Sequence, residues 1–374
     1  MPKKFDKNGV SYEMNITDNR SEDSKTNNSH KIENIRNIHE INKKINKEDA
    51  STTQKCIELL LKYFPKILDI YEIKECIGSG SESLVYKIIH KITNKSYALK
   101  LIFNNKKENR NIIEFNILNR LKHRNIILFF GVVEVKNGQL DCVIMEYAKF
   151  GNLRDFQKNI LKKQYFSEQL LCFLAYQILN GLNHCHKCKV AHLDLKPQNI
   201  IIDEFLNVKI IDFSVSIDYN RIKSNIIKLP FRGTNFYIAP EVIESKIINV
   251  KDLNKVDLYS FGVILYNLAF GQYPYNLNSE DSKNYDKILY KIQNNQLEFN
   301  DCEKYYSIYF IDFLKKLLEK DIKKRIDIKL ALNHYWIIGG NILLDDRENT
   351  YNSSCFLINI ITDHCLNFCK FINK

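Results

Sequence analysis

Two short segments in the middle of the sequence combine groups suited to phosphate chemistry. The first segment, AHLDLKPQNII at residues 191–201, contains Asp194 and Asn199. The second segment, IIDFS at residues 210–214, contains Asp212. Asp194 can accept or orient the proton of a substrate hydroxyl. The oxygen atoms of Asn199 and Asp212 are hard ligands of the kind that Mg²⁺ prefers. Phosphoryl transfer requires mainly positioning and charge neutralisation, and this set of groups supplies both.

Lys100 ends a mainly apolar, strand-like stretch and needs an anionic partner if it is buried. Phosphate oxygens could serve, and so could Glu114, which shares a face of a predicted helix with Ile117 and Leu118. The alternative interpretation is a lysine and a glutamate that are both exposed. These two residues alone do not decide between the interpretations.

A glycine-rich turn precedes these groups. Residues 77–85 read IGSGSESLV and fit the pattern G-x-G-x-x-G-x-V, except that Ser83 stands at the third glycine position. The two glycines let backbone amides approach phosphate oxygens without an intervening side chain. A Gly-Ser turn between strands is also ordinary in a hairpin, so this pattern alone is weak evidence.

Short strands and one helix must position the glycine-rich turn, Lys100 and Glu114. Short strand-like runs predict strands at 71–77, 84–90, 96–103, 127–135 and 140–146, and apolar spacing predicts a helix at about 111–121. After Gly151 the pattern is mainly helical as far as Trp336. A small strand-rich half followed by a larger helical half predicts a two-lobed α+β domain.

In their order and spacing these segments resemble the signatures of the eukaryotic protein kinase family, serine/threonine type. Further matches are GTNFYIAPE at 233–241, DLYSFG at 257–262, and Arg325. The resemblance extends from about Tyr71 to Trp336. It implies the two-lobed kinase fold, with a small antiparallel β lobe that carries one helix and a larger, mainly helical lobe.

The resemblance also implies roles for individual residues. The residues with catalytic roles would be Asp194, Lys196, Asn199, Lys100 and Glu114. Asp194 would act as the base, and Lys196 is the lysine typical of the serine/threonine form of the loop. Asn199 and Asp212 would be the ligands of Mg²⁺. Asp257 would tether the stack formed by Leu118, Phe129, His192 and Phe213, and Glu241 would form a structural ion pair with Arg325.

The implied cofactors are ATP and Mg²⁺. Val85, Ala98 and Ile201 match the positions that sandwich adenine. Met145 matches the gatekeeper, while Glu146 and Ala148 would present backbone groups to the purine. The complete set expected to contact the nucleotide is Ile77, Gly78, Ser79, Gly80, Val85, Ala98, Lys100, Met145, Glu146, Ala148 and Ile201.

Three residues depart from the family pattern. Leu193 replaces the arginine that normally pairs with a phosphorylated activation-loop residue, so we expect a non-RD kinase that does not depend on this phosphorylation. Ser214 replaces a glycine and restricts the backbone, and Ser83 adds a side chain to the glycine-rich turn. The alternative function is a pseudokinase scaffold that binds nucleotide and partners without turnover. Retention of the catalytic groups favours an enzyme, with proteins as its substrates.

The remaining segments flank this domain. We predict a mostly disordered extension at 1–55, a helical lead-in at 56–70, the small lobe at 71–146, the large lobe at 147–337 and a tail at 338–374. The lead-in is expected to lean on the small lobe. The tail is rich in Ile, Phe and Cys, and we expect a helix that docks on the large lobe or on a regulatory partner.

Composition narrows the partners and the location. The net charge of +11 would permit binding to nucleic acid or to an anionic membrane, but the lysines are scattered, so we expect neither. No stretch of 18 apolar residues occurs, and the first 50 residues lack the apolar segment of a signal peptide. Ten cysteines in such a chain are expected to be free thiols. The expected location is the cytosol or nucleus.

Two cysteine and histidine clusters could suggest zinc. In the segment HCHKC at 184–188, we favour packing, because ligands within one helix do not readily converge on a tetrahedral ion. The tail carries Cys355, Cys365 and Cys369 with His364. Zinc binding, association with a membrane surface and acylation of a cysteine stay open there as alternatives to docking.

Overall fold

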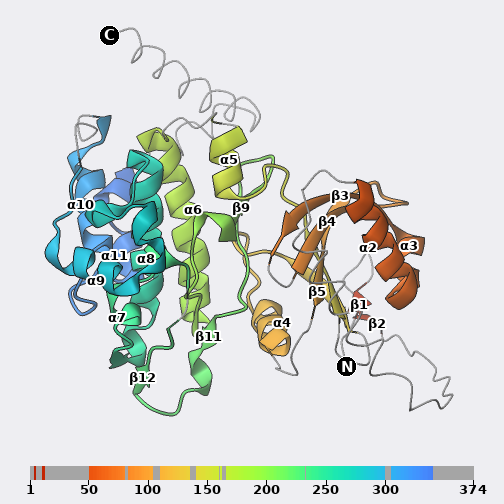
Figure 1. The fold of residues 1–374 in the computed structure, drawn as a ribbon, viewed down its shortest axis with the longest axis horizontal. Coiled ribbons are helices and arrows are strands. Elements are labelled where there is room, and N and C mark those ends of the chain that lie inside the picture. The colour runs from red at the N-terminus through yellow and green to blue at the C-terminus, as the bar shows by residue number, and fades with distance from the viewer. Residues whose placement is uncertain are drawn as a thin grey trace, which may run out of the picture. The chain divides into compact units, whose positions relative to one another are not determined.

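The computed structural model describes residues 4–5, 11–12, 50–80, 83–103, 110–134, 140–159, 161, 166–231, 233–299 and 305–339 (Figure 1). Contacts between Cα atoms divide the chain into a small unit, Met1–Asn109 with Leu128–Tyr147, and a large unit, Arg110–Ile127 with Ala148–Lys374. The predictions for residues 1–49 other than 4–5 and 11–12, for the tail from 340, and for Ser81 and Glu82 of the glycine-rich turn lie outside the described residues.

The small unit contains a five-stranded antiparallel sheet with strand order β3-β4-β5-β7-β6. Its strands are β3 (Tyr71–Ser79), β4 (Ser83–His90), β5 (Ser96–Phe103), β6 (Phe129–Glu134) and β7 (Leu140–Glu146). The predicted ranges of β5 and β7 are confirmed without change, and those of the other strands differ by one or two residues at an end. A separate pair consists of β1 (Lys4–Phe5) and β2 (Ser11–Tyr12).

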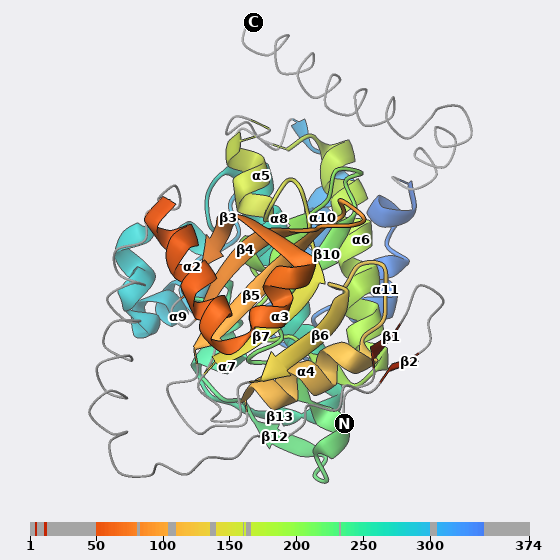
Figure 2. The same cartoon turned by 90° about the vertical axis from the view of Figure 1, so that its right-hand side faces the viewer.

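Two helices, α2 (Ala50–Tyr63) and α3 (Pro65–Ile70), cover one face of this sheet (Figures 1 and 2). Cys56, Leu60 and Phe64 recur every four residues and form an apolar stripe, which is buried together with Ile67. Their partners are the inward-facing residues Ile73, Leu84, Tyr86, Ile88, Leu99, Leu101, Phe103, Leu140 and Cys142. The lead-in therefore packs on the sheet, as predicted. The helix starts at Ala50, so residues 50–55, predicted to be part of a disordered extension, are helical.

The large unit is mainly helical. Its helices are α4 (Arg110–Arg120), α5 (Leu153–Asn159), α6 (Glu168–Lys187), α7 (Pro240–Ile243), α8 (Asn254–Phe270), α9 (Tyr285–Asn294), α10 (Ile308–Leu317) and α11 (Ile328–Leu332). Short 3₁₀ turns lie at Pro197–Asn199, Tyr219–Arg221, Asn235–Tyr237, Val250–Asp252, Pro274–Asn276 and Ser279–Lys283. Three two-stranded ribbons pair β9 (Ile200–Ile202) with β10 (Val208–Ile210), β8 (Val190–Ala191) with β11 (Ile217–Asp218), and β12 (Ile226–Lys228) with β13 (Ile247–Asn249).

Helix α8 forms the centre of the large unit because it is buried on nearly every side. At Gly262 an added Cβ would come within 2.9 Å of the Leu317 side chain, so glycine permits close approach of α8 and α10. Helix α6 is capped at its N-terminus by Ser167, whose hydroxyl accepts a hydrogen bond from the amide of Leu170. These helices supply the fixed base on which the loops of the site are built.

The α+β class, with an antiparallel strand-rich part and a mainly helical part, is confirmed. The helix predicted at about 111–121 is observed as α4 at Arg110–Arg120. Its contacts group it with the large unit, whereas the sequence assigned it to the small lobe. Among the residues described, no helix combines the length and apolar character needed to cross a membrane.

Candidate active site

The predicted base Asp194 lies at the centre of a hydrogen-bond network in the large unit. Its Oδ2 accepts a hydrogen bond from Lys196 Nζ at 2.7 Å, and its Oδ1 accepts one from Thr234 Oγ1 at 2.8 Å. Lys196 Nζ also donates to Thr234 Oγ1 at 2.8 Å. Only 13% of the Asp194 side chain is exposed. The network fixes the direction of the carboxylate and holds a positive charge beside it, as transfer of a phosphoryl group to a hydroxyl requires.

Asn199 is tied to the same network. Its Nδ2 donates to the main-chain oxygen of Asp194 at 2.9 Å and to Asp194 Oδ2 at 3.2 Å. Because both contacts use the amide nitrogen, the amide oxygen is the atom of this side chain that can ligate a cation. The main-chain oxygen of Asn199 accepts a hydrogen bond from Ile211 N at 2.9 Å, which brings the segment of Asp212 alongside. An amide oxygen and a carboxylate are donors that fit Mg²⁺.

Asp257 holds the backbone that leads to Asp194. This carboxylate is fully buried, and its two oxygens accept hydrogen bonds from His192 N at 2.9 Å and Leu193 N at 2.8 Å, while His186 Nε2 lies 2.9 Å from Oδ2. Burial alone would raise the pKa of Asp257, but contacts with His186, His192 and the Leu193 amide outweigh it and hold this pKa below its ordinary value. The Asp257 carboxylate is therefore charged in the folded protein.

Two residues of the site have left-handed backbone conformations, which cost free energy in a residue other than glycine. Leu193 has a φ of 64° and Asp212 a φ of 66°. Gly233 has a φ of 113°, and an added Cβ would lie 3.1 Å from the main-chain oxygen of Leu193. Glycine at 233 is therefore needed both for its backbone conformation and for space beside the catalytic loop.

One contact of the predicted stack, that between His192 and Phe213, is present. The rings of His192 and Phe213 meet edge to face with centroids 4.9 Å apart, and Phe213 is fully buried. His192 Nε2 lies 2.9 Å from the main-chain oxygen of Ile211, and Ser216 Oγ donates to the main-chain oxygen of His192 at 3.1 Å. These contacts fasten the start of the segment after Asp212 to the catalytic loop.

In the small unit, the pleat places several predicted nucleotide contacts on the sheet face opposite α2 and α3. Across β4, β5 and β7, Val85 stands opposite Lys100, and Ala98 stands opposite Met145. Gly78 of β3 stands opposite Val85. Since side chains alternate between faces, these residues share one side and leave the other to the apolar cluster. The apolar residues of this face together with the amine of Lys100 are suited to a purine and its phosphates.

The other predicted contacts occupy loops or strand ends. Ile77 and Ser79 lie on β3, and Gly80 N donates to Ser83 O at 2.8 Å, which closes the turn. Glu146 N donates to Leu128 O at 3.0 Å, which ties the end of β7 to the residue before β6. Ala148 and Ile201 belong to the large unit.

Lys100 and Glu114 lie in different units. Lys100 is half-buried on β5 of the small unit, and Glu114 is buried on α4 of the large unit, with 5% of its surface exposed. Their pairing stays a prediction. The two sets of predicted site residues are thus each assembled within their own unit.

The predicted structural ion pair is confirmed. Arg325 forms a two-pronged contact with Glu241, with nitrogen–oxygen distances of 2.6 and 2.9 Å, and both residues are buried. The Arg325 guanidinium also lies 4.9 Å from the centre of the Tyr259 ring. This paired and stacked charge joins α7 to the end of the domain.

The residues considered for zinc have other contacts. His186 contacts Asp257, and the ring of His184 stacks on that of His123 at 5.0 Å. Burial raises the pKa of the Cys185 thiol. Across the described ranges, no three His, Cys, Asp or Glu side chains converge in a way that could hold a metal ion. The cysteines of the tail lie outside these ranges.

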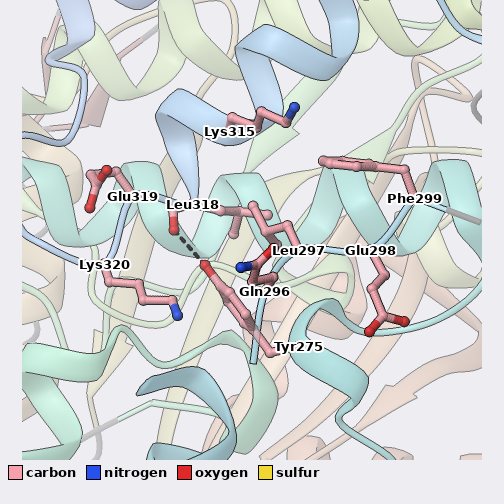
Figure 3. Close-up of a pocket in the computed structure, with 9 residues that line it drawn as sticks. All are labelled: Tyr275, Gln296, Leu297, Glu298, Phe299, Lys315, Leu318, Glu319 and Lys320. Carbon is pink, nitrogen blue, oxygen red and sulfur yellow. Dashed lines mark hydrogen bonds between the residues drawn. The ribbon is translucent and has the colours of Figure 1, made fainter. Parts of the chain in front are cut away.

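A hollow of about 780 Å³ lies elsewhere on the large unit (Figure 3). It is lined by residues 296–299, by Lys315 of α10, by residues 318–320 after that helix, and by Tyr275, whose hydroxyl donates to the main-chain oxygen of Leu318 at 2.6 Å. Lys320 Nζ lies 5.1 Å from the centre of the Tyr275 ring. None of the predicted site residues lines this hollow, so it is separate from the catalytic loop.

Thr234 was not among the predicted site residues, although it contacts both Asp194 and Lys196. The sequence offered a signal, because Thr234 follows Gly233 in a segment that matches the kinase pattern. The pattern marked the residue as typical of serine/threonine kinases without showing that its hydroxyl reaches the base.

Comparison with known proteins agrees with this arrangement. Residues 71–337 match the family model described as "Protein kinase domain". The serine/threonine-protein kinase pakH of Dictyostelium discoideum is 32% identical over 270 residues, covering 71% of this chain and 49% of the relative. The CBL-interacting serine/threonine-protein kinase 12 of Arabidopsis thaliana is 32% identical over 279 residues, covering 73% and 54%. The chain thus spans about half the length of these two relatives.

The human death-associated protein kinase 2 is matched over more of its length. It is 31% identical over 307 residues, which cover 78% of this chain and 78% of the relative. The family model extends over most of the chain and contains every residue of the catalytic network. The chain belongs to the protein kinase domain family.

Proposed function

We propose that this protein transfers the γ-phosphate of ATP to serine and threonine hydroxyls of protein substrates. The observation that carries the proposal is the network of Asp194, Lys196 and Thr234. Hydrogen bonds from Lys196 and Thr234 orient the Asp194 carboxylate, which is 13% exposed, and the Lys196 ammonium offsets its charge. The relatives named as serine/threonine kinases support the same class of substrate.

Each residue has a defined task in this reaction. Asp194 receives or orients the proton of the attacking hydroxyl, and Lys196 offsets negative charge that builds up on the transferred group. Asn199 and Asp212 would hold Mg²⁺, which when bound neutralises phosphate charge. Lys100 would bind the α- and β-phosphates and Glu114 would orient it. Val85, Ala98 and Ile201 would enclose the purine.

This activity does not require phosphorylation of the activation segment, which runs from Asp212 to Glu241. Leu193 is buried and uncharged, so it offers no partner for a phosphate. The segment is instead held by the pairing of β12 with β13 and by Leu229, which is 1% exposed and whose amide donates to Lys246 O at 3.1 Å.

The test is turnover of labelled ATP by the purified full chain with a mixture of protein substrates, followed by mapping of the modified residues. The Asp212→Ala variant is the matched control because it removes the main predicted ligand of Mg²⁺. We expect phosphoserine and phosphothreonine products from the wild type and only background from the variant. Equal background from both proteins would instead support the pseudokinase scaffold.

We further propose that residues 340–374 bind a regulatory partner, and that the protein acts in the cytosol or nucleus. Near Gly339 the large unit carries exposed apolar side chains: Ile308, Tyr309, Tyr335 and Ile338 are 77%, 53%, 78% and 40% exposed. The rings of Tyr309 and Tyr335 are 6.3 Å apart. Removal of residues 340–374 should change turnover or cellular distribution, and an unchanged result in both would count against this role.

A further inference from the structure

Asp218 is a nearly buried carboxylate near the start of the activation segment. Only 7% of its side chain is exposed, and its Oδ2 lies 3.1 Å from Arg120 Nη1 and 3.3 Å from Arg221 Nε. Its Oδ1 accepts a hydrogen bond from Asn220 N at 3.2 Å. A charge with so little exposure is costly unless it is paired, and here two guanidinium groups share it.

The two arginines connect Asp218 to different parts of the unit. Arg221 is three residues away in the same segment and is 65% exposed. Arg120 is the last residue of α4, the helix that carries Glu114. The contact with Arg120 is therefore the one that links separate elements, and a cation at a helix C-terminus is also favoured by the helix dipole.

The backbone around Asp218 is fastened to the strand that leads into the catalytic loop. Asp218 and Ile217 pair with Val190 and Ala191 of β8. Tyr219 N donates to Lys189 O, and its hydroxyl donates to His186 O, both at 2.9 Å. Since Asp194 follows β8 by three residues, the ion pair with Arg120 joins α4 to the strand that positions the base.

We propose that Asp218 is a positioning residue that fixes the activation segment to α4 permanently, without the phosphorylated residue that pairs with the arginine before the catalytic aspartate in other kinases. A carboxylate between guanidinium groups reproduces the charge-assisted contacts that a phosphate makes in such a place. Leu193 removes the usual arginine, and Asp218 supplies the missing anchor with its own charge. This inference rests on the proposed kinase activity.

The experiment compares Arg120→Gln with Arg221→Gln in the full chain. Both variants remove one guanidinium from the same carboxylate, but only Arg120→Gln breaks the link to α4. For Arg120→Gln we expect kcat to fall about tenfold, which corresponds to roughly 1.4 kcal/mol in the barrier. The conservative variant Arg120→Lys keeps a positive charge and should retain much of the wild-type kcat. For Arg221→Gln we expect kcat within about twofold of wild type, as is usual for an exposed pair. Hydrogen exchange of residues 110–120 and 217–222 should be faster in Arg120→Gln alone.

The exchange measurement does not depend on turnover, so it separates this inference from the proposed function. If the wild type shows no turnover but Arg120→Gln still speeds exchange in both segments, the proposed function is wrong and the anchor is real. If Arg120→Gln leaves kcat and exchange unchanged, or if Arg221→Gln has the same effect, the anchor is refuted. Arg120 is 40% exposed, so its replacement should preserve folding.

Discussion

The catalytic loop and the activation segment lie in the same unit but are held in different ways. Residues of the loop are fixed by side chains: Asp257 accepts from two loop amides, and Lys196, Asn199 and Thr234 converge on Asp194. Apart from the side-chain contacts of Asp218 and Thr234, the activation segment is held mainly by its backbone, through β11 on β8 and β12 on β13. Side-chain networks demand particular residues, whereas backbone ladders accept many.

In parts of the activation segment the backbone, rather than a side chain, makes the contact. Ile226 is 54% exposed and contributes mainly its backbone to the ribbon with β13. Val250 N donates to Asn225 O at 2.9 Å, which extends the same ribbon. A segment of this kind can stay in place without a phosphorylated residue. The comparison predicts that a substitution lowers stability or kcat strongly where the side chain holds the segment. The effect should be small where only the backbone holds it.

The largest effect is expected for Asp257→Asn. The amide nitrogen would face one of the donors that the carboxylate now accepts from, so the free energy of unfolding should fall by about 4 kcal/mol and kcat by at least about a hundredfold. Because the pKa of Asp257 is held below its ordinary value, the stability gap to wild type should shrink as the pH falls below about 4.

Chemical denaturation at several pH values and steady-state kinetics measure both effects of this substitution. The control is Asp252→Asn, which removes a partly exposed carboxylate 3.5 Å from Lys255 and should cost less than about 1 kcal/mol. Equal losses in the two variants would mean that Asp257 has no special part in holding the loop.

The next effect in size is expected for Leu229→Ala at the end of β12. Leu229 is 1% exposed, so truncation leaves a cavity and should lower the free energy of unfolding by about 2 kcal/mol. The matched variant Lys228→Ala alters an exposed neighbour in the ribbon and should change it by less than about 0.5 kcal/mol. Thermal denaturation compares them, and similar shifts would show that burial of Leu229 does not anchor the segment.

Gly233→Ala should reduce kcat by about tenfold, since the added methyl meets the Leu193 carbonyl and the backbone conformation becomes strained. The control is Gly131→Ala, where an added Cβ meets nothing within 4 Å. Kinetics of both variants decide the point. A Gly233→Ala enzyme with wild-type kcat would show that contact between the segment and Leu193 is dispensable.

The smallest effect is expected for Ser224→Ala. Ser224 is exposed, and its hydroxyl accepts only a local hydrogen bond from Ile226 N at 3.1 Å. Basal kcat should stay within about twofold of wild type, and phosphatase treatment of the wild type should have as little effect. A loss of more than about tenfold, or about 1.4 kcal/mol in the barrier, would show that phosphorylation at this position matters.

Much of the catalytic loop could be predicted because its chemistry is local in sequence. Asp194, Lys196 and Asn199 lie within six residues, and their types alone indicate a base, a cation and a metal ligand. The strands of the small unit were predictable for a similar reason, since each is a short local run rich in apolar residues. The roles of these residues remain proposals until turnover is measured.

The sequence could not predict contacts between segments that lie far apart in the chain, because no periodicity or motif spacing relates them. The approach of Arg120 to Asp218 and that of Thr234 to Asp194 depend on how helices and ribbons pack. The start of α2 was missed because residues 50–55 are polar or small, with no apolar periodicity to reveal a helix. Their helical state follows from the stripe at Cys56, Leu60 and Phe64, whose burial stabilises the whole element.

The helices α2 and α3 also bear on where the independently folding domain begins. The family match starts at residue 71, but the sheet that begins there is covered by side chains from residues 56–67. A fragment that started at Tyr71 would leave Tyr86, Leu99 and Leu101, each now fully buried, open to water on that face. Such a patch promotes association between chains. A fragment meant to keep this face of the sheet covered should therefore include α2 and α3, which precede the start of the family match.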